Sequence, residues 1–191
     1  MKLGIDFYCR DDVVRVSREL LGKVLCTQIG GEPVSAVIIE TEAYAGTTDK
    51  ASHAYGGRRT RRTEPMYSRG GVAYVYLCYG IHHLFNVVSG KEGTPHAVLV
   101  RAAKPLEGIA TLMRRRHRTV TETRLMPGPG TVSQALGIHT GMTGTDLTAE
   151  RIWIEDRGIR VRAKDIVAAP RIGVGYAAED ALRPYRFSVL L

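Results

Sequence analysis

The sequence predicts an α+β fold: a single domain with a mostly antiparallel curved β-sheet, a protruding β-hairpin and a few flanking helices. Strand-like segments outnumber helical ones, and the two kinds do not alternate in the regular order of a parallel α/β fold. Residues 72–90 form two strand-like halves around a Tyr-Gly pair, which is typical of a hairpin. No repeat, low-complexity tract or long linker divides residues 1–191, so one domain is expected.

The first half of the chain predicts one helix and a strand pair. Residues 11–21 (DDVVRVSRELL) form the helix, with Asp11 or Asp12 capping its start and Gly22 placed for a left-handed ending. Residues 24–29 and 35–44 are the strands, joined by the turn sequence GGEP. The polar segment that follows, 46–71, exceeds the usual length of a connection, which indicates a functional or partly helical loop.

The second half adds a strand over residues 96–105 and a helix over 105–118. Pro105 is expected to end the strand and to open the helix, whose apolar residues recur at the helical spacing i, i+3, i+4, i+7. The remaining expected elements are the loop MPGPG, a short helix SQAL ended by Gly137, a strand over 151–156, and the strand-like pieces DIVAAPRIGVG and YRFSVLL.

Composition excludes several classes of protein. No apolar run approaches the roughly 20 residues of a membrane span. The N-terminal sequence MKLGIDFYCRDD becomes acidic where a signal peptide would become apolar. The three cysteines contain no C-x-x-C pair, so neither a disulfide framework nor a zinc site is indicated. We therefore expect a cytoplasmic protein without a membrane partner.

The basic charge indicates a possible polyanionic partner. The formal net charge is +8, and arginines cluster in RRTRR (58–62) and MRRRHR (113–118). Guanidinium groups match phosphate oxygens well. Charge alone is equally consistent with a solvated basic face.

The stretch IETEAY (39–44) ends a core strand with acidic side chains. Side chains alternate along a strand, so Glu40, Glu42 and Tyr44 are expected to share one face. At the rim of a buried region, a carboxylate's pKa can be tuned for general-base chemistry. The alternative is a strand that leaves the core with both glutamates in water.

Three tyrosines lie close together in YVYLCYG (74–80). Tyr74 and Tyr76 share a strand face that could stack a nucleobase, and Tyr79 precedes Gly80 at the expected hairpin tip. A bulky side chain at such a tip suits insertion into a base stack. The alternative is that all three are ordinary sheet residues with solvated hydroxyl groups.

Other polar residues are ambiguous when each is considered alone. His53 in the long loop is a surface histidine or a site residue, and Asn86 among apolar neighbours is a hydrogen-bonded core residue or a specificity group. Arg101 directly follows HAVLV and could end a core strand at the same rim as Glu42. The glycines of RIGVG (171–175) allow a close approach of the backbone.

Several sequences, taken in order, carry a family resemblance. They are ETEAY, a histidine nine residues after Tyr44, GGR, YVYLCYG, an asparagine seven residues past Tyr79, LVRAAKPLEG, GPG…QALGI and RIGVGYA…RPYRF. This ordered set, from about residue 7 to the C-terminus, resembles the alkyladenine (3-methyladenine) DNA glycosylase family. In one departure, Thr131-Val132-Ser133 follows GPG where many members carry lysine.

The resemblance implies an activity. A monofunctional enzyme of this family, without lyase activity, flips a damaged purine out of double-stranded DNA and hydrolyses its bond to the sugar, with no metal or organic cofactor. Glu42 would be the general base that activates the water, Arg101 would hold that water, and the backbone at Ile172 would be a third contact. The expected partner is duplex DNA with damaged purines, bound by a monomer without an obligatory protein partner.

The resemblance also implies how the base is recognised. Tyr44, His53 and Tyr76 would sandwich the flipped base, Asn86 would crowd the exocyclic amine of normal guanine, and Tyr79 would fill the gap left in the duplex. Two other functions stay open: a catalytically silent module that binds damaged DNA, and an RNA-binding domain. No side chain is assigned as a general acid for neutral lesions such as hypoxanthine.

Overall fold

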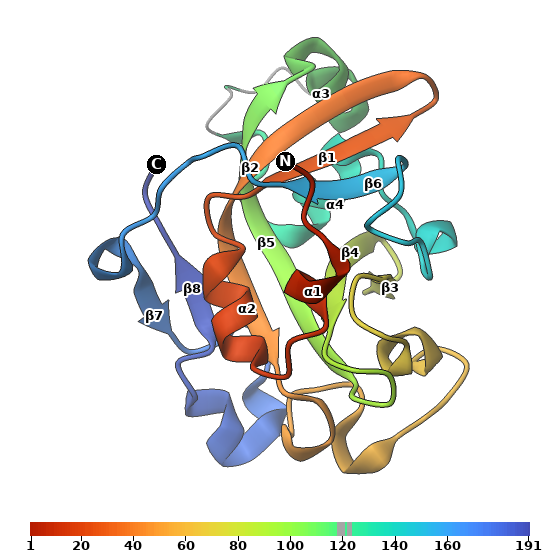
Figure 1. Cartoon of the computed structure of the whole chain (residues 1–191), viewed down its shortest axis with the longest axis vertical. Helices are drawn as coiled ribbons and strands as arrows, with labels where there is room; N and C mark the ends of the chain where they lie inside the picture. The colour runs from red at the N-terminus through yellow and green to blue at the C-terminus, as the bar shows by residue number, and fades with distance from the viewer. Residues whose placement is uncertain (118–120, 122–123) are drawn as a thin grey trace.

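One antiparallel sheet organises the molecule (Figure 1). The computed structural model describes residues 1–117, 121 and 124–191. The eight strands in this part of the chain are β1 (Val24–Ile29), β2 (Glu32–Tyr44), β3 (Ala73–Cys78), β4 (His82–Ser89), β5 (His96–Glu107), β6 (Ile152–Glu155), β7 (Val167–Ala169) and β8 (Arg186–Ser188).

Strand β2 is the centre of the sheet. The strand order is β3-β4-β5-β2-β1-β6, and β8 pairs with both β2 and β7. All of these pairings are antiparallel. The β2–β5 register shifts on both sides of Glu40, which marks a bulge. Bulges bend a strand and change the direction of its side chains, so this one helps to curl the sheet beside Glu42.

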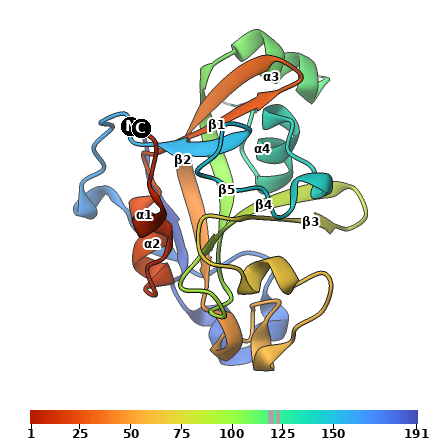
Figure 2. The same ribbon diagram turned by 45° about the vertical axis from the view of Figure 1, so that its right-hand side comes forward.

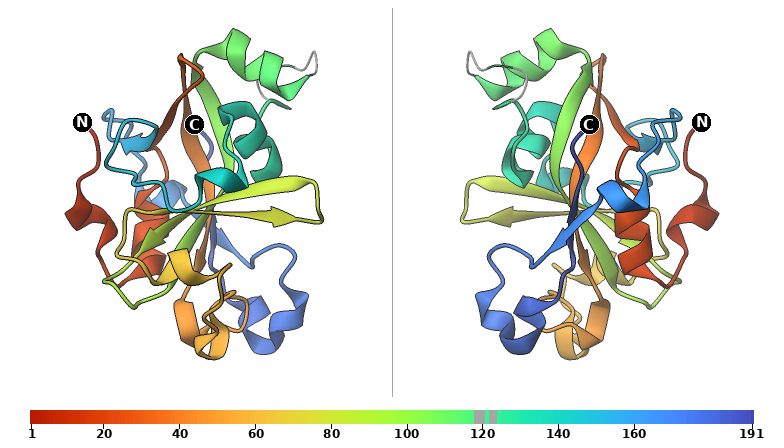
Figure 3. Two further views of the ribbon diagram at one scale, coloured as in Figure 1. Left: turned by 90° about the vertical axis from the view of Figure 1, so that its right-hand side faces the viewer. Right: turned by 90° about the vertical axis from the view of Figure 1, so that its left-hand side faces the viewer.

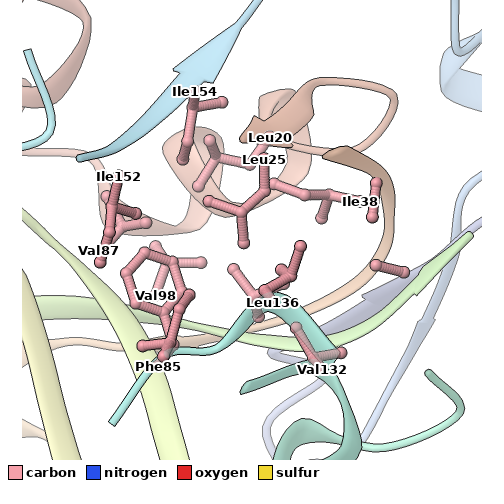
Figure 4. Packing of buried hydrophobic residues seen from close by; sticks show 14 of the residues in the cluster. Leu20, Leu25, Ile38, Phe85, Val87, Val98, Val132, Leu136, Ile152 and Ile154 are labelled. Atoms are coloured by element: carbon pink, nitrogen blue, oxygen red, sulfur yellow. The ribbon is translucent and has the colours of Figure 1, made fainter. Parts of the chain in front are cut away.

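Helices cover both faces of the sheet. Helices α1 (Ile5–Tyr8) and α2 (Val13–Glu19) lie on one side, and α4 (Pro129–Leu136) lies on the other (Figure 2). Helix α3 (Ile109–Arg116) packs beside α4. Buried side chains from helices α1 to α4 and from every described strand except β7 pack together in the main core, part of which Figure 4 shows. Among the described residues, no helix combines the length and apolar character needed to cross a membrane.

Most predicted elements of the first half are confirmed. The Asp12 side chain accepts a hydrogen bond from the Arg15 amide at the start of α2, and Gly22 is left-handed with φ of 78°. The long loop is partly helical, as one alternative proposed. It contains the 3-10 turns η1 (Gly46–Thr48), η2 (Tyr55–Gly57) and η3 (Glu64–Tyr67). The hairpin of β3 and β4 projects from the body of the protein (Figure 3).

The prediction that Pro105 opens a helix is wrong. Strand β5 continues through Pro105, which pairs with Ala36 beside a register shift where a missing N–H is tolerated. Helix α3 begins only after Gly108, whose φ of 70° is left-handed. A Cβ atom at Gly108 would lie 2.6 Å from Val34 Cγ1, so a side chain would clash with β2 there. Glycine, not proline, therefore sets the strand-to-helix boundary.

The remaining elements begin or end differently from the prediction. The expected short helix SQAL is the last part of α4, which begins four residues earlier at Pro129 and ends at left-handed Gly137 as expected. The three C-terminal strand predictions are confirmed in shorter form as β6, β7 and β8. The additional 3-10 turns are η5 (Thr140–Met142), η6 (Ala163–Asp165) and η7 (Gly175–Leu182).

Gly70 provides a test of how α1 supports the base of the hairpin. A Cβ atom at Gly70 would lie 2.2 Å from the carbonyl oxygen of Tyr8, and backbone atoms cannot move aside easily. We expect Gly70→Ala to lower the free energy of unfolding by about 1–3 kcal/mol, measured by chemical denaturation. Gly4→Ala is the control, because a Cβ at Gly4 has no neighbour within 4 Å. Equal stability of the two variants would contradict this packing.

Candidate active site

A cavity of about 630 Å³ lies between the end of β2, the hairpin and the loop that follows β7. The predicted site residues that line it are Tyr44, His53, Tyr76, Tyr79, Asn86, Arg101 and Ile172. The remaining predicted residue, Glu42, contacts three of these lining residues. The fold therefore gathers side chains that are up to 130 positions apart in the chain.

Glu42 is a fully buried carboxylate near the end of β2. Its Oε1 accepts a hydrogen bond of 2.8 Å from the Ile172 amide, and its Oε2 accepts one of 2.7 Å from the Tyr44 hydroxyl. Burial raises the pKa of Glu42, although Arg101, the Ile172 amide and the Tyr44 hydroxyl oppose this effect. The alternative of a solvated glutamate is wrong. Each carboxylate oxygen keeps acceptor capacity for a further donor such as water.

Arg101 lies between Glu40 and Glu42 of β2. Its guanidinium is 3.4 Å from Glu42 Oε1 and 3.7 Å from Glu40 Oε2. Glu40 is also held by Arg186 of β8, at 2.8 Å. The expected shared rim is confirmed, but Arg101 is in the middle of β5 instead of at its end. The contribution of Arg186 was missed, because only the pairing of β8 with β2 brings it near.

Aromatic rings form one side of the cavity. The rings of His53 and Tyr76 meet edge to face, with centroids 4.6 Å apart. His53 Nδ1 is 2.9 Å from the hydroxyl of Tyr74, which is buried behind it. As expected, Tyr74 and Tyr76 share a strand face, with ring centroids 5.5 Å apart. The Tyr74 hydroxyl is bonded to His53, so Tyr74 supports the histidine ring. The alternative of solvated hydroxyl groups is therefore wrong for Tyr74.

The His53 imidazole is uncharged at neutral pH. Burial, together with the nearby guanidinium groups of Arg62 and Arg58, lowers the pKa of His53 to about 4. A neutral ring can stack against a cationic ligand without charge repulsion. The cavity is thus suited electrostatically to a flat cation between aromatic side chains.

Asn86 of β4 is a hydrogen-bonded core residue, as one of the two alternatives predicted. It is buried, and its Nδ2 donates hydrogen bonds to the Tyr74 and Leu84 carbonyl groups at 3.1 and 3.2 Å. It also lines the cavity. These bonds fix the amide, so its side chain is a rigid part of the cavity wall.

Tyr79 projects from the hairpin tip and is 88% exposed. Tyr79 and Gly80 both have positive φ, 51° and 72°, and the Ile81 amide donates to the Cys78 carbonyl across them. Two positive φ values are typical of a type I′ turn, which keeps the hairpin tight. The neighbouring apolar side chains Leu77 and Ile81 are also exposed. Sequence reasoning missed these two, although they alternate with Tyr79 in the sequence.

One arginine cluster lies beside the cavity. Arg58, Arg61 and Arg62 are exposed, and the Arg62 guanidinium lies 5.2 Å from the centroid of the Tyr76 ring. The second cluster, in α3, is instead used in packing at the opposite end of the sheet (Figure 1). There Arg114 pairs with Glu32, and Arg115 donates to the Ile29 carbonyl. Arg118 lies outside the described residues.

Other residues around the cavity have structural partners. Thr131, the first residue after GPG, lines the cavity, and its Oγ1 accepts a hydrogen bond of 3.0 Å from the Gly128 amide at the start of α4. In the described ranges, no group of three or more His, Cys, Asp or Glu side chains gathers to hold a metal ion.

Sequence reasoning also missed a buried ion pair behind the cavity. Arg171 and Asp49 form a salt bridge whose side chains are fully buried, and Arg171 directly precedes Ile172. The two residues are 122 positions apart. Only the unexplained RIGVG segment indicated that this region mattered.

Comparisons with known proteins agree with the geometry of the cavity. The family model described as methylpurine-DNA glycosylase (MPG) matches residues 6–190. The chain is 47% identical over 182 residues to a protein of Chlamydia felis, covering 95% of this chain and 92% of that protein. It is 43% identical over 193 residues to a Desulfitobacterium hafniense protein, covering 97% and 94% respectively. Both relatives carry the provisional name 3-methyladenine DNA glycosylase. With its matching family model and near full-length relatives, this chain belongs to the methylpurine-DNA glycosylase family of DNA repair enzymes.

Proposed function

We propose that this chain is a monofunctional DNA glycosylase. It rotates an alkylated purine nucleotide of the 3-methyladenine type out of duplex DNA and hydrolyses the bond between the base and the deoxyribose. The observation that carries this proposal is a buried carboxylate, Glu42, next to Arg101 and directly behind an aromatic cavity.

The reaction needs a water molecule, a general base to deprotonate it and stabilisation of the positive charge on the sugar. Glu42 accepts a proton from the water as the water oxygen bonds to the anomeric carbon, while Arg101 orients that oxygen. The glycosidic bond breaks, and its electron pair leaves with the base. An anionic Glu42 also stabilises the positive charge that develops on the sugar. A cationic alkylated purine leaves as a neutral molecule, so its departure needs no general acid.

Recognition of the damaged nucleotide depends on the aromatic side chains of the cavity and on the tip of the β3–β4 hairpin. Tyr44, His53 and Tyr76 hold the flipped base, and the neutral His53 adds no repulsion toward a cation. Asn86 crowds the exocyclic amine of guanine. Tyr79 occupies the space that the flipped nucleotide leaves, because flipping costs a few kcal/mol of stacking and pairing that must be offset. All of these groups belong to one chain, so a monomer without a protein partner or cofactor suffices.

Replacing Glu42 tests the catalytic assignment. Glu42→Gln keeps the shape of the side chain but cannot accept the proton, so we expect release of 3-methyladenine from methylated duplex DNA to fall at least ~100-fold. The measurement is a single-turnover base-release assay. Glu150→Gln is the control, because Glu150 is an exposed residue that does not line the cavity. Full activity of Glu42→Gln would contradict the assignment.

The pH dependence should follow Glu42 and not His53. Because Glu42 must be ionised and burial raises its pKa, excision should fall as the pH decreases, with a midpoint above the usual range for glutamate. The pKa of His53 is about 4, so His53→Phe should change the rate without moving that midpoint. Single-turnover rates between about pH 5 and pH 8 measure both effects. A midpoint that moved in His53→Phe would assign the titration to the histidine.

Removing the tip side chain tests base flipping. We expect Tyr79→Ala to weaken binding to lesion-bearing duplex by about 1–3 kcal/mol, the usual contribution of one stacked ring. Fluorescence of a 2-aminopurine beside the lesion would report the loss of unstacking. Leu182→Ala is the control, since Leu182 is also a strongly exposed apolar residue but lies outside the cavity lining. Unchanged flipping by Tyr79→Ala, or preferred binding of single-stranded RNA, would contradict the proposal.

A further inference from the structure

We infer that the buried Arg171–Asp49 ion pair is a positioning device for the proposed catalytic base, acting through the Ile172 amide and the Tyr44 ring. This inference rests on the proposed function. Neither residue lines the cavity, so their role is to hold the groups that do.

The ion pair joins three segments of the chain. The Arg171 guanidinium binds both carboxylate oxygens of Asp49, at 2.5 and 2.8 Å, and donates to the Asp180 carbonyl at 3.1 Å. Asp49 also accepts hydrogen bonds from the Ala45 and Ala51 amides, at 2.9 and 3.0 Å. A planar guanidinium suits such a fixed set of acceptors. The loop before His53 and the loop at Ile172 are therefore fixed to each other.

Arg171 is linked to two backbone segments beside Glu42: the strand that carries Glu42 and the loop at Ile172. Its Nη1 donates to the Ala43 carbonyl at 2.8 Å, and Ala43 is the residue between Glu42 and Tyr44. The next residue along the chain, Ile172, donates its amide to Glu42 Oε1. The same side chain thus fixes the strand that carries Glu42 and the loop that carries its hydrogen-bond donor.

Arg171 also supports the ring of Tyr44. The guanidinium carbon lies 4.8 Å from the centroid of the Tyr44 ring, and the Arg171 side chain is fully buried, whereas Tyr44 lines the cavity. The arginine therefore packs against the ring from behind and leaves the cavity side free. Asp49 balances its charge, so the Tyr44 ring can still face a cationic base.

The titration of Glu42 reports the position of the Ile172 amide. A hydrogen bond to the ionised carboxylate lowers its pKa, so displacement of the amide should raise the pKa. Other charged and titratable side chains around Glu42 come from β2, β3, β5, β8, η7 and the loop between β7 and η7, and they also influence its pKa. These are Glu40, Tyr44, Tyr76, Arg101, Arg171, Tyr176 and Arg186.

The test replaces the pair without leaving a buried charge alone. In Arg171→Met with Asp49→Asn, both charges are removed together, which the fold tolerates better than the loss of one partner. The Asn oxygen can still accept from the loop amides, and Met fills the space behind Tyr44. Arg171→Lys is the second variant, because it keeps the charge but lacks the planar fork. Ile154→Ala, in the main core and outside the cavity lining, is the control for a general loss of stability.

Two readouts decide the outcome. Carbon NMR of the side-chain carboxyl groups, with Glu42 identified by its loss in Glu42→Gln, should show an upward shift of the Glu42 titration in both pair variants. Single-turnover base release per folded molecule should fall about 10- to 100-fold, as expected when reacting groups are displaced by about 1 Å. Ile154→Ala should change neither readout.

An unchanged Glu42 titration together with unchanged base release in the pair variants would overturn the inference. If the double variant does not fold, the Glu42 titration and the base release of Arg171→Lys test the inference instead. Wild-type protein that releases no base at any pH would instead overturn the proposed function. The carboxyl titration would still test the ion pair in that case, because it needs no DNA.

Discussion

A carboxyl group buried near the end of a curled strand is the constraint on which the site depends. Glu42 has no exposed surface, and an ionised group in such a place is costly unless charges and hydrogen bonds stabilise it. Its partners come from β2 itself, from β5 and from the loop at Ile172. The stabilisation of one side chain therefore requires three distant segments to meet, and the cavity forms where they do.

The position of β2 in the sheet brings these three segments together around Glu42. It pairs with β5 on one side and with β1 and then β8 on the other, so Glu40 and Glu42 face side chains from two partner strands. The bulge at Glu40 turns the end of the strand toward the cavity. Strand β4 continues the sheet from β5 into the hairpin, which places the exposed Tyr79 at the edge of the same cavity. Rigid strands, rather than long side chains, set the spacing of the groups.

Local pattern and family resemblance predicted much of this arrangement. Alternation along IETEAY placed Glu42 and Tyr44 on one face, and a Tyr-Gly pair between two strands predicted the hairpin tip. Local pattern failed at Pro105, where pairing with β2 overrode the tendency of proline to start a helix. It also missed the Arg171–Asp49 pair, because residues 122 positions apart meet only through the folded sheet and its loops. Contacts of that kind leave no periodic signal in a sequence.

The central claim is that a flipped nucleotide lies in the ring-lined cavity with its sugar within reach of a water held by Glu42. A crystal structure of the protein with a duplex that carries a cationic pyrrolidine in place of one deoxyribose would measure this directly. The account predicts an extrahelical residue in the cavity, a single water between its ring and the Glu42 carboxylate, and the Tyr79 ring in the duplex gap. A nucleotide still stacked in the helix, or a Glu42 carboxylate beyond the reach of one bridging water, would contradict it.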